Sequence, residues 1–110
     1  MPRLSDPSTL FGRRLREARS RAGIPQDKLG VAIGLDESSS SARMSRYETG
    51  VHEPPFATAQ ALAKVLKVPV AYFYCDEDRL AEFLIQYGGF DVRGRRKVLA
   101  FAAELSAGTA

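Results

Sequence analysis

The chain has 110 residues, of which 45% are hydrophobic and 26% are charged, and its formal net charge is +3. That length favours one folded domain with at most an appended element. The single cysteine, Cys75, and the single histidine, His52, exclude an internal disulfide, a cysteine–histidine zinc site and a nucleophile–base pair typical of enzymes. The sequence has no apolar run of about 18 residues and no charged-then-apolar leader, so it predicts a cytoplasmic protein without membrane span or cofactor.

Arginines gather in the first 25 residues, where six of them stand against two acidic residues. An apolar residue at every third or fourth position predicts a helix from about Ser8 to Ala22, with Gly23 as a left-handed stop. The face expected to be buried consists of Phe11, Leu15, Ala18 and Ala22. The arginines are interpreted either as contacts to nucleic acid or as the solvated face of this helix.

A second helix is expected from Gln26 to Ile33, followed by a chain reversal at Gly34. A serine-rich stretch leads into a third helix that ends at Gly50. Asp36 or Ser38 is expected to cap this third helix, which would then extend backward through the serines and place their hydroxyls at its positive end.

Within the third helix, Met44 and Tyr47 are expected to face inward, while Arg43 and Arg46 share an outward face. Two arginines beside a row of hydroxyls on a short helix have the chemistry needed to enter a major groove. The two helices together therefore indicate a helix-turn-helix that reads double-stranded DNA.

The remaining chain is also expected to be helical. Pro54-Pro55 opens a fourth helix that runs to Lys67, and residues 70–74 form a short fifth helix. Two more helices follow the acidic run at residues 76–78. Residues 79–105 are predicted to form a dimer interface or, alternatively, to cover the domain itself; the apolar contacts come from Leu80, Phe83, Leu84, Tyr87, Val98, Phe101 and Leu105.

Several residues together resemble the signature of the phage repressor and Cro-like helix-turn-helix family, over about residues 9–74: Gln26, Leu29, Gly34, Met44-Ser45-Arg46-Tyr47-Glu48, Gly50 and Pro54. The resemblance implies an all-α fold, a five-helix repressor-like domain at 9–75 between a tail at 1–8 and a helical extension at 76–110. It also implies a sequence-specific transcriptional regulator, a repressor that reads a near-palindromic operator as a homodimer. No small-molecule ligand is evident.

By the same resemblance, Arg46 occupies a base-reading position, Arg43 is better placed for phosphate, and Gln26 heads a helix that contacts phosphate. The methyl group of Ala42 could touch thymine. The full set of expected DNA-binding residues is Gln26, Ser39, Ser40, Ser41, Ala42, Arg43, Ser45 and Arg46. Arg19 and Glu48 match a family pair that clamps the first helix to the third.

Three departures from the family pattern are visible: Gly30 replaces an alanine, Pro25 replaces a capping serine or threonine, and residues 36–43 are about four longer than the usual turn. The serines could therefore form a flexible loop. Acidic residues near the reading helix, such as Asp36, Glu37 and Glu53, would repel phosphate. They keep open a protein-interaction module, co-activator-like or antitoxin-like, on the same fold.

Overall fold

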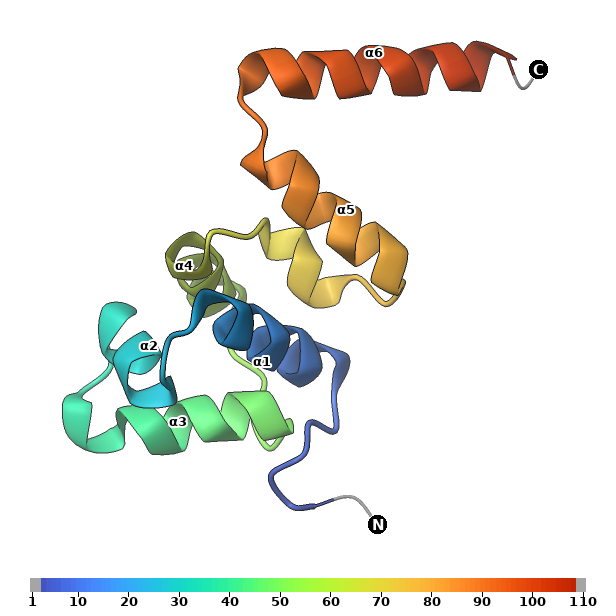
Figure 1. Cartoon of the computed structure of the whole chain (residues 1–110). Helices are drawn as coiled ribbons and strands as arrows, with labels where there is room; N and C mark the ends of the chain where they lie inside the picture. The colour runs from blue at the N-terminus through green and yellow to red at the C-terminus, as the bar shows by residue number, and fades with distance from the viewer. Residues whose placement is uncertain (1–2, 109–110) are drawn as a thin grey trace.

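The computed structural model describes residues 3–108, which contain helices and no strand (Figure 1). The elements are α1 (Leu10–Ala22), α2 (Gln26–Ala32), α3 (Glu37–Thr49), α4 (Phe56–Leu66), the 3₁₀ helix η1 (Val70–Tyr74), α5 (Asp78–Gly89) and α6 (Val92–Gly108). We call α1 to η1 the five-helix domain. The order confirms the predicted all-α fold with two further helices, while residues 1 and 2 of the expected tail lie outside the described range.

Helix α1 begins at Leu10, slightly later than predicted, because the Thr9 side chain accepts a hydrogen bond from the Gly12 amide at 3.0 Å. It ends as predicted, with Gly23 in the left-handed conformation. Phe11, Leu15 and Ala18 are buried on one face. Ala22 is exposed, so the prediction that it is buried was wrong. It lies on the same face of α1, but in the last turn, which extends beyond the core.

The core of the five-helix domain lies between α1, α2, α3, α4 and η1. The rings of Phe11 in α1 and Phe73 in η1 pack in a tilted arrangement at a centroid distance of 4.9 Å. The large hydrophobic side chains with almost no exposed surface are Leu15, Leu29, Met44, Leu62, Tyr72 and Phe73 itself. Since each element contributes at least one of these side chains, the positions of α2 and α3 are fixed by the same core.

Helix α5 packs on the domain through Ala81, which is buried, and Ile85, whereas Leu80 and Phe83 remain largely exposed. Part of the predicted apolar stripe therefore faces away from the core of the five-helix domain, and its role as a dimer contact stays a prediction. The cause of this orientation lies at the start of the helix. The buried Arg14 donates to Asp78 at 2.9 Å and to the carbonyl oxygen of Cys75 at 2.9 Å, and this fixes which face of α5 meets the core.

Helix α6 extends from the end of α5 and does not pack on the five-helix domain, as Figure 1 shows. None of its residues is buried, and Leu99, Phe101 and Leu105 are 56%, 61% and 56% exposed. The interpretation in which this helix covers its own domain is thus wrong. Over residues 3–108, no helix is both long enough and apolar enough to cross a membrane.

Candidate nucleic-acid interface

The two helices of the predicted helix-turn-helix, α2 and α3, are joined by a short turn that is held by hydrogen bonds. Gly34 has a φ of 94°, a left-handed conformation that glycine adopts without steric cost. The amide of Leu35 donates to the Gly30 carbonyl at 2.9 Å. Asp36 then caps α3, because its carboxylate accepts hydrogen bonds from both the amide and the hydroxyl of Ser38, each at 2.9 Å. The predicted cap is confirmed.

These two hydrogen bonds also lower the pKa of the Asp36 carboxyl. The extra residues of the serine-rich stretch are helical and form the first turns of α3. The longer sequence therefore lengthens the helix and leaves the turn short, so the alternative of a flexible serine loop is wrong.

Gly30 and Ser40 form a close contact between α2 and α3. A Cβ atom on Gly30 would lie 1.9 Å from the Ser40 Oγ, which donates to the Asp27 carbonyl oxygen at 2.6 Å. Ser40 has no exposed surface. Its expected role in DNA contact is therefore wrong, because its hydroxyl is used to hold α2 against α3. The same contact explains why glycine stands where the resembled family has alanine.

The outward face of α3 is marked by Ser39, Ala42 and Arg46, which lie within about 40° of the direction opposite the buried Met44. Ala42 and Arg46 are exposed and Ser39 is half-buried. Arg43 is exposed on the flank and shares a groove with Pro55 and Thr58 at the start of α4. The outward face of α3 thus carries the Ser39 hydroxyl, the Ala42 methyl group and the Arg46 guanidinium group, and its flank carries the Arg43 guanidinium group.

The remaining expected contacts differ in accessibility. Ser41 is exposed, and Ser45 and Gln26 are half-buried. The Gln26 side-chain amide donates to Glu48 at 3.3 Å, so this residue also connects α2 to α3.

A buried carboxylate fixes α3 against α1. Glu48 has no exposed surface and accepts hydrogen bonds from Arg19 Nε at 2.5 Å and from Arg16 Nε at 3.0 Å. Burial raises the pKa of the Glu48 carboxyl, but the hydrogen bonds from Arg19 and Arg16 outweigh burial, so this pKa lies below its ordinary value. The predicted Arg19–Glu48 pair is confirmed. Arg16 was missed, although it lies three residues before Arg19 on a helix and so on a neighbouring face.

All five arginines of α1 form ion pairs with carboxylates. Arg13 and Arg14 pair with Asp78, and Arg21 pairs with Glu82 at 3.0 Å, so these three connect α1 to α5. Arg43 and Arg46, in contrast, form no ion pair or hydrogen bond through their side chains within residues 3–108. Arg43 and Arg46 therefore supply unpaired positive charge on α3, whereas the arginines of the α1 region are used largely to hold the helices together.

The chain is similar to known proteins in sequence and in structure. Residues 10–72 match the protein-family model described as a helix-turn-helix domain. An HTH-type transcriptional regulator of Sinorhizobium medicae is 31% identical over 65 residues, which are 59% of this chain and 44% of that protein. One of Sinorhizobium fredii is 34% identical over 65 residues, 59% of this chain and 43% of that protein. The chain thus spans less than half the length of these relatives.

The crystal structure of the transcriptional regulator BswR is similar with a TM-score of 0.85 and 42% sequence identity. The match covers 90% of this chain and 98% of that chain. It therefore extends beyond residues 10–72 and includes most of the C-terminal helices.

Proposed function

Because the chain belongs to the helix-turn-helix domain family, we propose that it is a sequence-specific DNA-binding transcriptional regulator whose helix α3 enters the major groove. One observation carries this proposal: the outward face of α3 presents Ser39, Ala42 and Arg46, with Arg43 on its flank. These groups are accessible, while the buried face of the same helix is fixed by Glu48. A rigid helix with an unbound cationic face suits recognition that depends on exact register.

Each exposed group has a role that follows from its chemistry. Arg46 donates to guanine O6 and N7 in bidentate fashion, a contact that discriminates by about 1–3 kcal/mol. Ala42 contacts the thymine methyl group, and Arg43 contacts phosphate. Further polar contacts come from Ser39, Ser41, Ser45 and Gln26.

We also propose that the protein acts as a homodimer that reads a near-palindromic operator. One such helix contacts too few base pairs for useful specificity, whereas two reading helices about 34–36 Å apart read successive turns of the duplex. Exposed apolar side chains available for the dimer are Leu99, Phe101 and Leu105 on α6 and Leu80 and Phe83 on α5. A dimer bound in this way excludes other proteins from its operator and so acts as a repressor.

The second candidate is a protein-interaction module. Asp36 and Glu37 are exposed at the amino end of α3, where a carboxylate repels phosphate. If that end of the helix faces a protein partner, the two carboxylates are accommodated without this repulsion. DNA binding separates the two candidates.

The test begins with selection of a preferred duplex from a random-sequence library by the full chain. Affinity for the selected duplex and for a scrambled duplex is then measured by fluorescence anisotropy at two salt concentrations. We expect affinity to fall steeply with salt, because each phosphate contact releases counterions, while the preference for the selected duplex persists. Failure to select any sequence, or equal affinity for both duplexes, would contradict specific DNA recognition and favour the protein-interaction module.

A further inference from the structure

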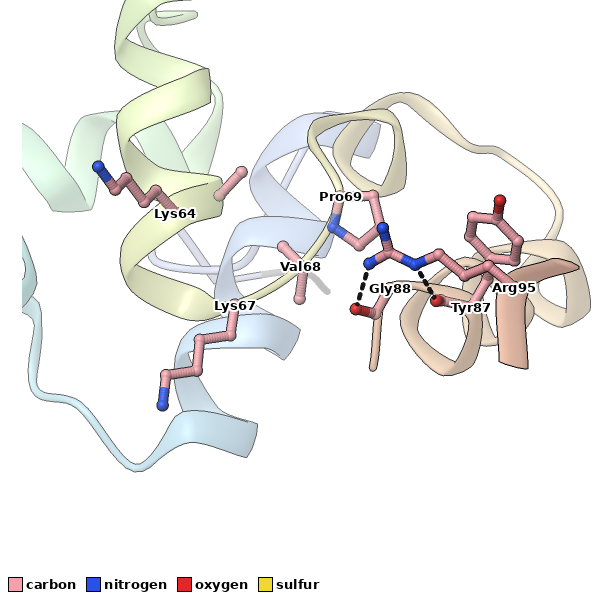
Figure 2. A pocket seen from close by; sticks show the side chains of 8 residues that line it. Lys64, Lys67, Val68, Pro69, Tyr87, Gly88 and Arg95 are labelled. Atoms are coloured by element: carbon pink, nitrogen blue, oxygen red, sulfur yellow. Dashed lines mark hydrogen bonds between the residues drawn. The ribbon is translucent and has the colours of Figure 1, made fainter. Parts of the chain in front are cut away.

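A pocket of about 380 Å³ lies where the C-terminal helices meet the five-helix domain (Figure 2). One wall is formed by the end of α4 and the following connector, with Lys64, Lys67 and Pro69, and the other by the end of α5 and by Arg95 of α6. Its volume lies at the lower end of the range for small-molecule sites, about 300–1,000 Å³. None of its lining residues belongs to α2 or α3, so the pocket is separate from the proposed DNA-reading face.

The pocket is positively charged. Its lining contains three cationic side chains and no carboxylate. Lys64 and Lys67 are exposed, and within residues 3–108 neither ammonium group forms a hydrogen bond or an ion pair. Arg95 donates to the carbonyl oxygens of Tyr87 and Gly88 at 3.2 and 2.8 Å through Nε and Nη2. Because a guanidinium group carries five N–H donors, Arg95 retains donors for an anion.

The rest of the lining is apolar and closely packed. Val68, Pro69 and the Tyr87 ring contribute hydrocarbon surface, and the Arg95 guanidinium carbon lies 5.4 Å from the centroid of that ring. A Cβ atom on Gly88 would lie 3.0 Å from Pro69 Cγ, so α5 and the connector are already in contact. A ligand that fits this surface needs an apolar body as well as a negative charge.

Lys67 adds a backbone observation. Its φ of 58° is left-handed, a conformation that a lysine adopts less readily than glycine or asparagine. This conformation ends α4, because Lys67 is its C-cap and the Lys67 amide donates to the Ala63 carbonyl oxygen. The helix end thereby places one of the three cations beside the pocket.

We propose that this pocket binds a small organic carboxylate with an aromatic or short hydrocarbon body. In Figure 2 the Lys64 and Lys67 side chains extend away from Arg95, so the carboxylate pairs with Arg95, the two lysines add positive charge at the rim, and the apolar body lies on Val68, Pro69 and Tyr87. Because the two walls belong to different parts of the chain, the ligand contacts the five-helix domain and α6 at the same time.

The test uses sodium benzoate as an anionic probe and benzyl alcohol as a neutral probe of the same ring. Both are titrated into the ¹⁵N-labelled full chain while amide chemical shifts are recorded by NMR. We expect benzoate to give saturable shifts centred on Lys64, Lys67, Gly88 and Arg95, and benzyl alcohol to bind at least about tenfold more weakly. The double variant Lys64→Gln/Lys67→Asn should weaken benzoate binding by about tenfold or more, whereas the control Lys28→Gln, in α2, should not change it.

Three results would overturn the proposal. One is the absence of saturable benzoate shifts at these amides. Another is equal binding of the two probes, which would show that the pocket recognises the ring alone. The third is a response of the same amides to protein dilution and none to benzoate, which would show that a second copy of the chain covers the pocket.

Discussion

Gly30→Ala should destabilise the protein, although the same change normally stabilises a helix. Alanine in a helix interior is favoured over glycine by about 0.8–1 kcal/mol. Here the new Cβ atom would lie 1.9 Å from Ser40 Oγ, 3.0 Å from Ser40 Cβ and 3.2 Å from Met44 Cγ. Relief by rotation of the hydroxyl would break its hydrogen bond to the Asp27 carbonyl, which contributes about 1 kcal/mol.

Overpacking of the remaining contacts costs a further 1–3 kcal/mol or so. After the propensity gain is subtracted, we expect the free energy of unfolding to fall by about 1–3 kcal/mol. Urea denaturation followed by circular dichroism measures this change. The matched control is Gly89→Ala in the last turn of α5, where nothing lies within 4 Å of the added Cβ and the glycine φ is not positive.

The control variant should be neutral or slightly stabilised. The variant Ser40→Ala should lose about 1 kcal/mol alone, and its effect should not add to that of Gly30→Ala, because the two residues are in contact. If Gly30→Ala stabilised the protein as much as Gly89→Ala, or if the two effects at positions 30 and 40 were additive, the interlocked contact between α2 and α3 would be refuted.

Three further predictions concern the ion pairs of Glu48 with Arg16 and Arg19, here called the clamp, and the C-terminal helix α6. Glu48→Gln should lower the free energy of unfolding by about 3 kcal/mol, measured in urea, because it leaves Arg16 and Arg19 without their buried counter-charge; a loss below about 1 kcal/mol would contradict the clamp. Folding lowers the pKa of Glu48, so the ionised carboxylate stabilises the fold above the ordinary glutamate pKa of about 4.3, and this stabilisation is lost as the pH falls through the pKa of the folded state. The free energy of unfolding of the wild type should therefore fall more steeply on acidification than that of Glu48→Gln. Parallel pH profiles would contradict this. Truncation after Phe90 should give a folded monomer in analytical ultracentrifugation, since it removes α6 but keeps Asp78 and the buried Ala81. A truncated chain that remains dimeric would show that α6 is not needed for the dimer.

The sequence predicted those parts of the fold that depend on local spacing and on single residues with restricted roles. The buried face of α1 follows from the three- and four-residue spacing of Phe11, Leu15 and Ala18. The ends of α1 and α3 follow from Gly23 and Gly50, both of which have positive φ. These features need no knowledge of distant contacts.

The features that could not be predicted depend on pairs of residues far apart in the chain. The inward position of Ser40 requires the absence of a side chain at Gly30, and a run of identical serines has no periodicity that shows which hydroxyl is buried. The orientation of α5 depends on the ion pair between Arg14 and Asp78, 64 residues apart. Arg14 itself is only 3% exposed and looked, in sequence, like one of several solvated arginines.

The proposed reading face of α3 can be tested directly by measuring base preference with an Arg46→Ala variant. The selected duplex is substituted one base pair at a time, and the affinities of wild type, Arg46→Ala and the control Arg79→Ala on α5 are compared. We expect Arg46→Ala to lose about 1–3 kcal/mol of discrimination at one guanine position in each half-site, with other positions and the control unchanged. Equal weakening of Arg46→Ala on every duplex would show that Arg46 contacts phosphate only and would contradict base reading by this face.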